Sequence, residues 1–205
     1  MHQRSVVYGL AEPMEFVYFP IDSVLSVVTV MRDGTQIEVL TIGREGLCGA
    51  QALLDRATVT TMTTTQVGGD AHRIPVASFL ELCRTWPAFR SVVERLLSAQ
   101  MDVMAQSIAC NRLHLVNERC ARWLLTMHDR VGRADFPLTH ELLATMLGVR
   151  RAGVSIAAAS LQHAGFIRYV RGKFTIVDPR GLASVACECY SAINRAYDAR
   201  LLPTV

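Results

Sequence analysis

Hydrophobic positions in the first third of the chain fall in short runs of β-branched and aromatic residues, which are typical of β-strands. Three of these runs cover residues 16–19, 24–30 and 36–42. Further strand-like runs cover residues 58–67 and 71–74. Asp33-Gly34 separates the second and third runs and is a strong signal for a tight hairpin. Several short strands separated by turn signals predict a β-sandwich or jelly roll.

The hydrophobic pattern changes to helical spacing near Pro75. We expect a short helix over residues 76–83 and a long one from Ala88 to about Leu115. The long helix carries a stripe with the 4-3-4 spacing of a coiled-coil seam, formed by Val92, Leu96, Ala99 and Val103. This stripe would pack either on the β domain of its own chain or on a second copy. We favour a homodimer seam, because so long a helix between two compact domains has more apolar surface than one barrel covers.

A further helix is predicted over residues 117–131, and residues 138–177 then read as helix, tight turn, second helix and small hairpin. Thr139 is a good N-cap for the first of these two helices, and Gly148 ends it where a positive φ is readily adopted. The second helix starts near Arg150 and ends at Gly165, and strands follow near 167–170 and 173–177. This arrangement resembles a helix-turn-helix with a wing. A last helix is expected over residues 181–201.

Basic residues gather in this unit, although the formal net charge of the chain is only +3. Six basic residues and one acid, Asp178, lie between Gly148 and Arg180. The start of the second helix is the part that enters a major groove, and a basic wing would lie over neighbouring phosphates. A helical hairpin with a solvated basic face is the alternative. We favour DNA binding, carried by Thr139, Arg150, Arg151, Gly153, Ser155, Arg168, Arg171 and Lys173.

The composition predicts a cytoplasmic protein with no membrane partner. The first ten residues lack an apolar core of signal-peptide length, and the longest apolar stretch is far too short to span a bilayer. The six cysteines form no C-x-x-C pair, so we expect them to be reduced and mostly buried.

The sequence predicts no metal site. Cys110 and His114 are four residues apart on a helix, but no third ligand lies near them in sequence. Cys187 and Cys189 are expected on the last helix, where their side chains would point apart, which argues against a redox pair.

The order of β-roll, long helix and winged helix-turn-helix resembles the cyclic-AMP receptor/FNR family of bacterial transcription regulators. The resemblance rests on Asp33-Gly34, the turn over 43–49, the helix segment 95–101 and the unit 138–177. It implies an α+β architecture: an N-terminally short β-roll (a jelly roll like those that bind cyclic nucleotides) over 1–87, a dimerisation helix over 88–116 and a winged helix-turn-helix over 117–205. It also implies a homodimer on a near-palindromic site in double-stranded DNA, with RNA polymerase as a further partner and a small-molecule effector at the β-roll.

The sensor region departs from the family pattern. Cyclic-nucleotide binders of the family hold the ribose with a Glu after a Gly and the phosphate with an Arg-Ser pair. Here Gly49 is followed by Ala50, and the Arg-Ser position falls near Val59-Thr60, neither of which is basic. A phosphate without its arginine loses its main charge-assisted partner, which argues against cyclic AMP and cyclic GMP. The N-terminal cysteine cluster that holds an iron–sulfur centre in the oxygen-sensing branch is also missing.

Two interpretations of the β-roll follow from these departures. It binds an unidentified effector, with a pocket expected around Cys48, Gly49, Ala50 and Thr60, or it is a scaffold without a sensing role in a constitutive DNA-binding dimer. The second helix of the helix-turn-helix, which would read the DNA bases, also departs from the family. The family commonly has Arg-Glu-Thr at its start, whereas this chain has Arg151-Ala152-Gly153. Glycine inside a helix costs about 1 kcal/mol relative to alanine, which a close approach of the backbone to DNA would explain. We therefore expect an operator different from the familiar ones.

An enzyme is the remaining alternative. A β-roll can hold a metal-dependent oxygenase or isomerase, but that chemistry needs converging histidines and a carboxylate. The strand regions of this chain offer only His72, and no Gly-x-Ser-x-Gly motif is present. The sequence thus predicts that the chain is not an enzyme.

Overall fold

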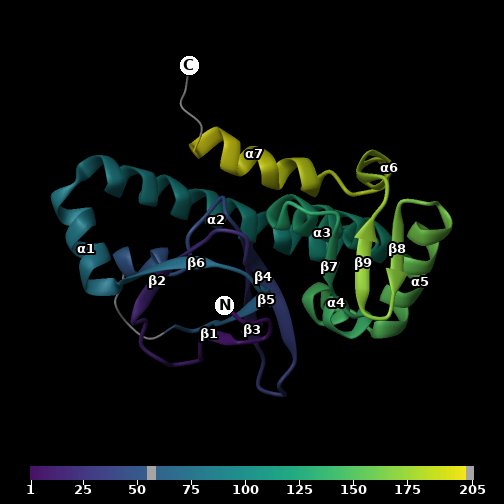
Figure 1. The fold of residues 1–205 in the computed structure, drawn as a ribbon, viewed down its shortest axis with the longest axis horizontal. Helices are drawn as coiled ribbons and strands as arrows, with labels where there is room; N and C mark the ends of the chain where they lie inside the picture. Colours follow the sequence, from purple (N-terminus) through teal and green to yellow (C-terminus); the bar gives the residue numbers. More distant parts are fainter. Residues whose placement is uncertain (55–58, 202–205) are drawn as a thin grey trace.

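A long helix, α2 (Pro87–Leu113), is the element against which the rest of the molecule packs. The computed structural model describes residues 1–54 and 59–201 (Figure 1). A β-roll lies against one side of α2, and a smaller unit of helices and three strands lies at its C-terminal end. No single helix of the described residues is long and apolar enough to cross a membrane.

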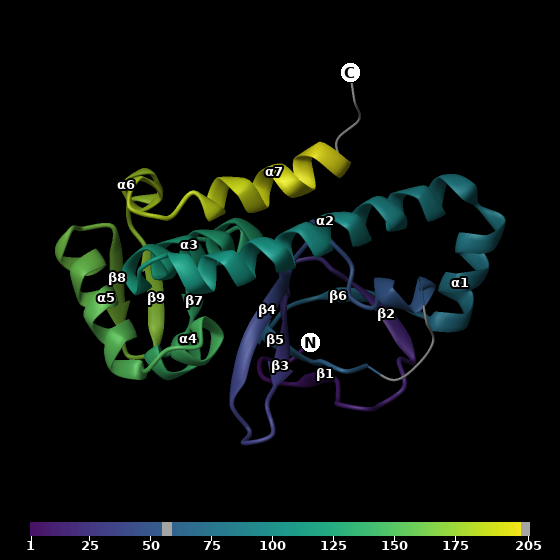
Figure 2. The same ribbon diagram turned by 180° about the vertical axis from the view of Figure 1, so that it is seen from behind.

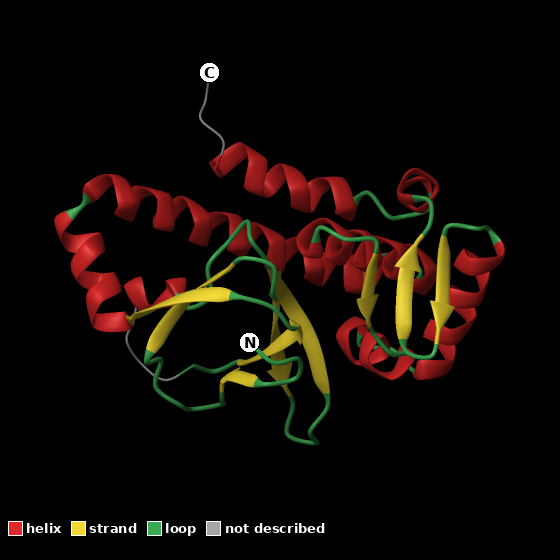
Figure 3. Ribbon diagram, viewed as in Figure 1, coloured by secondary structure: helices red, strands yellow, loops and turns green. Residues whose placement is uncertain are grey.

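The β-roll contains two antiparallel sheets (Figure 3). Its strands are β1 (Val6–Tyr8), β2 (Phe16–Pro20), β3 (Val24–Val30), β4 (Gln36–Ile42), β5 (Met62–Val67) and β6 (Ala71–Pro75). One sheet has the order β1-β5-β3-β4, and β2 pairs with β6. A short 3-10 helix, η1, covers Ala50–Leu53.

Most of the predicted strands are confirmed. β3 and β4 have the predicted bounds, and Gly34 between them has a φ of +83°, as the Asp33-Gly34 turn requires. The run predicted over 58–67 forms a strand only from Met62 onward, and its first residue lies outside the described part of the chain. The prediction missed β1, because three residues with one buried side chain leave no readable pattern.

The helix α1 (Val76–Thr85) joins the β-roll to α2. The last helix, α7 (Cys189–Leu201), lies along α2 on the side away from the β-roll, as Figure 2 shows. Val103 of α2 shares one core with Ile193 and Tyr197 of α7 and with buried residues of the β-roll. The long helix is therefore covered on two sides by its own chain.

This packing corrects the predicted dimer seam. Leu96, Ala99 and Val103 are buried within the chain, and only Val92 of the predicted stripe is exposed. Periodicity identified an apolar face correctly, but the chain's own β-roll and α7 cover that face.

The C-terminal unit has the predicted winged helix-turn-helix order. Its helices are α3 (Val116–Val131), α4 (His140–Leu147) and α5 (Arg151–His163). Its strands β7 (Asp135–Pro137), β8 (Ile167–Val170) and β9 (Lys173–Ile176) form an antiparallel sheet with the order β7-β9-β8.

The prediction of a single helix over 181–201 is wrong, because the structure has two separate helices in this region. A short helix, α6 (Pro179–Ser184), precedes α7, and Cys187 lies in the linker between them. The Asp178 side chain caps α6 by accepting hydrogen bonds from the backbone N–H groups of Arg180 and Gly181. The break places Cys187 and Cys189 on the same side of the chain rather than pointing apart, and it brings both close to Cys110 and His114.

The β-roll and the C-terminal unit share a buried polar contact around Glu38 of β4. Its carboxyl group accepts hydrogen bonds from Ser26 Oγ (2.5 Å), Thr41 Oγ1 (2.8 Å) and Trp123 Nε1 of α3 (2.7 Å). Val24, Val28 and other buried side chains of the β-roll pack into the same core as the C-terminal unit. The hydrophobic core is therefore continuous between the two predicted domains.

We expect the Glu38 carboxyl group to make stability depend on pH. Burial raises the pKa of Glu38, although the hydrogen bonds from Ser26, Trp123 and Thr41 act in the opposite direction. The folded protein therefore holds this proton to a higher pH than the unfolded chain does. The stabilisation is complete below the ordinary pKa of 4.5 and is lost as the pH rises through the raised pKa.

In the Glu38→Gln variant the amide keeps the hydrogen-bond network but does not ionise. The free energy of unfolding, measured by chemical denaturation between pH 4 and pH 8, should fall with rising pH in the wild type and lose that component in the variant. Trp123→Phe is the matched control: it removes one donor, costs about 1–3 kcal/mol and keeps the pH dependence. Parallel pH profiles for the wild type and Glu38→Gln would assign the dependence to another group.

Candidate nucleic-acid interface

The turn between α4 and α5 is fixed by local signals and by contact with the β-roll. Thr139 Oγ1 accepts a hydrogen bond from the Leu142 N–H (3.1 Å), so the predicted N-cap is confirmed. Gly148 ends α4 with a φ of +62°, and a Cβ atom there would lie 2.6 Å from Ile37 Cδ1 of β4. Glycine adopts this backbone conformation readily and avoids a clash with the end of the Ile37 side chain.

The first turns of α5 present a mixed basic and apolar surface. Arg150 is the N-cap and Arg151 the first helical residue, and both are exposed. Arg151 Nε lies 3.7 Å from Glu141 Oε2, a solvated pair that DNA phosphates or bases can displace. Along the same helix Ala152, Ile156 and Ala159 are also exposed, with Ile156 at 72%. The predicted DNA-binding set did not include these apolar residues, although their alternation with the buried Val154, Ala157, Ala158 and Leu161 marks them as the outer face.

Ser155 is held in place by a contact that the sequence did not indicate. Its Oγ lies 3.0 Å from His140 Nδ1, and the His140 ring stacks on Tyr169 of β8 with the ring centroids 4.1 Å apart. Burial and the nearby Arg151 charge lower the pKa of His140, so the ring is neutral at physiological pH. This cluster ties α4, α5 and the wing into one rigid unit.

The wing turns through Arg171 and Gly172. Both residues have positive φ, +47° and +79°, as a type I′ two-residue hairpin requires. The Arg168 and Arg171 side chains are exposed, and Arg171 lies at the tip. Lys173 is also exposed, but its Nζ lies 2.5 Å from Asp135 Oδ2 of β7, so part of the expected positive charge is neutralised.

A separate cavity of about 460 Å³ lies between the β-roll and α2. Its wall is mostly aliphatic, with Leu40 and Ile42 from β4 and Leu97, Met101 and Met104 from α2. Gln100 also lines it and is fixed by a hydrogen bond from its Nε2 to the Leu47 carbonyl oxygen (3.0 Å). Among the described residues the lining carries no charged side chain.

The predicted effector pocket is partly corrected by this cavity. Cys48 and Thr60 line it, whereas Gly49 and Ala50 do not. Ala50 is fully buried in the core, and a Cβ atom on Gly49 would collide with the Tyr8 hydroxyl oxygen. Gly49, with a φ of +98°, therefore serves the packing of the turn.

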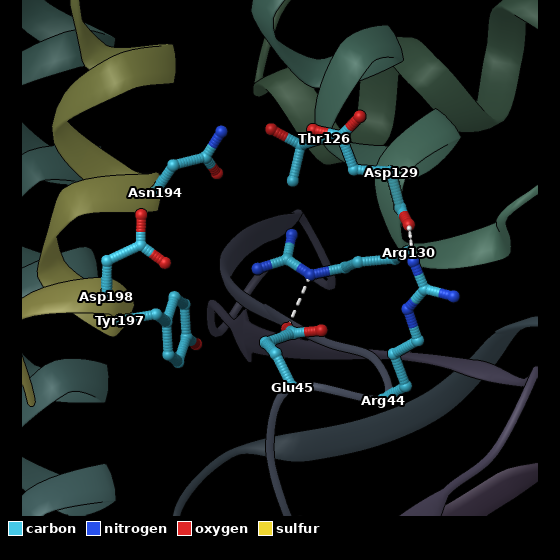
Figure 4. A pocket seen from close by; sticks show the side chains of 8 residues that line it. All are labelled: Arg44, Glu45, Thr126, Asp129, Arg130, Asn194, Tyr197 and Asp198. Carbon is cyan, nitrogen blue, oxygen red and sulfur yellow. Dashed lines mark hydrogen bonds and ion pairs between the residues drawn. The ribbon is translucent and has the colours of Figure 1, made fainter. Parts of the chain in front are cut away.

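A polar junction connects the turn after β4 to α3 and α7 (Figure 4). The Arg130 Nε of α3 lies 2.6 Å from Glu45 Oε1, and both side chains are largely buried. Arg44 Nη2 donates a hydrogen bond to the Asp129 carbonyl oxygen (3.3 Å). Burial works against the Arg130 charge, but Glu45, Tyr197 and Glu38 together outweigh it and keep the pKa of Arg130 above its ordinary value. A displacement of this turn would therefore act directly on α3. This helix carries the reading unit, which is the helix-turn-helix of α4 and α5 with its wing.

Comparisons with known proteins agree with this arrangement. The model of the Crp-like helix-turn-helix domain matches residues 118–185. A CRP-family transcriptional regulator from Thermus thermophilus has a TM-score of 0.76 and 19% identity, with 91% of this chain and 95% of that chain covered. FixK2 from Bradyrhizobium japonicum has a TM-score of 0.77 and 15% identity, with coverage of 90% and 94%. No curated protein matches the sequence.

The solved structures establish the fold, and the domain match establishes the DNA-binding unit. Regulators of this type are not enzymes, so the assignment bears out the expectation that this chain is not one. The resemblance found in the sequence is confirmed: residues 118–185 form a Crp-like helix-turn-helix DNA-binding domain, and the chain has the fold of CRP/FNR transcription regulators.

Proposed function

We propose that the chain acts as a homodimer that reads a near-palindromic DNA site. The observation that supports this most directly is the exposed start of α5, where Arg150 and Arg151 stand beside an apolar outer face. Arg151 is suited to a bidentate contact with guanine, and Ile156 to contact with a thymine methyl group. Arg168, Arg171 and Lys173 of the wing would hold the neighbouring phosphates, and Thr139 contributes by capping α4.

The dimer seam that we propose lies on a different stripe of α2 from the one predicted. Leu97, Met101, Met104 and Ile108 follow one another with 4-3-4 spacing. Met101 is 62% exposed and Ile108 is 71% exposed, Leu97 and Met104 are half-buried, and the adjacent stripe is buried in the chain. An apolar stripe of this length, on a helix that the family uses for dimerisation, fits a second copy of the same chain.

The cavity between the β-roll and α2 is the proposed effector site. Its described lining fits an uncharged and largely apolar molecule better than a cyclic nucleotide, whose phosphate needs a charged partner. Leu97, Met101 and Met104 line the cavity and also belong to the proposed seam. An effector would therefore change the packing of the seam, and through it the spacing of the two reading helices. RNA polymerase is the further partner expected of such a regulator.

A constitutive dimer is the second candidate. It is favoured by the described lining of the cavity, which includes neither Gly49 nor Ala50 and carries no charged side chain that would bind a nucleotide phosphate. The test below separates the two candidates.

Selection of bound fragments from random DNA by the purified chain tests the proposed function. Without ligand, enrichment of an inverted repeat with half-sites about one helical turn apart would support a constitutive dimer. Enrichment only after addition of a metabolite extract would support a sensor. Failure to enrich any sequence under both conditions would contradict the proposal.

Arg151→Ala should relax the preference at one base position and cost about 1–3 kcal/mol of binding free energy. Lys173→Ala should instead weaken binding to all DNA sequences equally.

Met101→Asp should dissociate the dimer and leave the monomer folded, because it places a charge on the proposed seam. Light scattering measures the mass, and circular dichroism checks the fold. Val6→Asp is the matched control, since Val6 is similarly exposed (57%) but lies on β1. Leu96→Asp should instead unfold the chain, because Leu96 is buried. A Met101→Asp variant that remains dimeric would place the seam elsewhere.

Gly153→Ala should separate folding from DNA binding. Among the described residues a Cβ atom at Gly153 would contact only Val116 Cγ1, at 3.9 Å, so the fold itself does not require glycine there. Alanine should therefore stabilise the chain by about 1 kcal/mol in thermal or chemical denaturation. If the α5 backbone approaches DNA closely at this point, the same variant should bind the selected operator more weakly. Unchanged affinity would show that Gly153 is not at the DNA surface.

A further inference from the structure

Four potential metal ligands meet where the C-terminal end of α2 contacts the start of α7. The ligand atoms of Cys110, His114, Cys187 and Cys189 all lie within 4.8 Å of one another. Cys110 and His114 occupy the end of α2, Cys187 lies in the linker after α6, and Cys189 begins α7. The three cysteines are buried and form a small core of their own. The third ligand that the sequence seemed to lack is thus supplied by a segment 77 residues farther along the chain.

Two distances within this cluster match the edges of a tetrahedral zinc site. The sulfur atoms of Cys110 and Cys187 are 3.6 Å apart, and Cys189 Sγ lies 3.5 Å from His114 Nδ1. Ideal tetrahedral bonds to zinc imply about 3.8 Å between two sulfur ligands and about 3.6 Å between a sulfur and a nitrogen ligand. A disulfide bond would instead bring two sulfur atoms to about 2.05 Å.

Neighbouring residues orient the ligands in the way that zinc sites require. His114 directs Nδ1 toward the cysteines, while its Nε2 lies 3.0 Å from Glu188 Oε2. A ligating histidine commonly donates its second N–H to a carboxylate, which fixes its tautomer. Gln106 Nε2 donates a hydrogen bond to Cys189 Sγ (2.9 Å), as is suitable for a thiolate ligand.

The charge around the cluster is also compatible with a bound ion. Three thiolates, one neutral imidazole and Zn²⁺ carry a net charge of −1, and Arg119 and Arg122 are buried on the adjacent α3. The Nε of Arg122 has no hydrogen-bond partner among the described residues.

We propose that Cys110, His114, Cys187 and Cys189 bind one Zn²⁺ ion. Three thiolates and one imidazole form a closed tetrahedral set, as in structural zinc sites. An iron–sulfur cluster fits less well, because it distributes its protein ligands over two or more iron atoms and so holds them farther apart. Binding releases the thiol protons and forms three Zn–S bonds and one Zn–N bond, with no change of oxidation state.

The ion would join the long helix α2 to the reading unit. Cys110 and His114 lie at the last turn of α2, directly before α3 begins at Val116. Arg119 of α3 donates hydrogen bonds to Asn111 Oδ1 (2.7 Å) and to the Leu147 carbonyl oxygen at the end of α4. A metal bond across α2 and α7 at this point would restrict the angle between α2 and the helix-turn-helix.

Metal content of the reduced full-length chain tests the proposal without reference to DNA binding. We expect elemental mass spectrometry to find one zinc ion per chain. Titration of chelator-treated protein with Co²⁺ should give the visible bands of tetrahedral cobalt and a sulfur-to-cobalt charge-transfer band. Glu188→Gln should lower zinc affinity by about 10-fold, because it removes the partner of the histidine.

Matched variants make the assignment specific. Cys187→Ser and Cys189→Ser should lose the ion, whereas Cys83→Ser and Cys120→Ser, at buried cysteines outside the cluster, should keep it. His114→Cys should keep one ion and strengthen the charge-transfer band, which protects the test against variants that fail to fold. Absence of binding by the folded, reduced chain in the presence of zinc would overturn the proposal. Zinc binding that persists in both serine variants would also overturn it. So would formation of a Cys110–Cys187 disulfide in place of a zinc complex.

Discussion

The buried carboxyl group of Glu38 is the constraint on which the arrangement of the two units depends. It receives one hydrogen bond from β3, one from its own strand and one from Trp123 of α3. In a buried site each of these donors would be costly to leave without a partner, so β4 and α3 are held at a fixed distance and register. The Arg130–Glu45 pair adds a second polar contact a few residues farther along the same segment. A change in the shape of the β-roll therefore reaches α3 through two directed contacts rather than through apolar packing alone.

Each face of helix α2 makes different contacts. One face forms the core with the β-roll and α7, the adjacent stripe carries Met101 and the other residues of the proposed seam, and the last turn carries Cys110 and His114. Because a packed helix moves as a rigid body, changes at the proposed effector cavity, at the proposed seam and at the end of α2 would be mechanically linked. This sharing explains why α2 carries two stripes with coiled-coil spacing, one largely buried within the chain and one partly exposed.

Local signals in the sequence predicted local structure well. Asp33-Gly34, the Thr139 cap and Gly148 each act within a few residues, and the structure confirms all three. The seam and the cysteine cluster depend on contacts between distant segments, which periodicity does not contain. An apolar stripe such as that of Leu96 and Val103 looks the same whether its own chain or a partner covers it. The ligands of the proposed metal site were visible as two pairs, Cys110 with His114 and Cys187 with Cys189, but only the break before α7 brings the pairs together.

The reading unit combines rigidity with an unusual surface. The Ser155–His140–Tyr169 cluster fixes α5 against the wing, so DNA recognition requires little ordering of the protein. The outer face of α5 contains small apolar residues and Gly153 where a family member with Arg-Glu-Thr would place two polar side chains. Such a face has few hydrogen-bonding groups beyond Arg151, so its specificity must come from methyl contacts and from the fit of the backbone to the groove. In the proposed dimer, discrimination among sites would depend strongly on the angle and spacing of the two α5 helices. These are the quantities that the junction with the β-roll, the seam and the proposed zinc site would control.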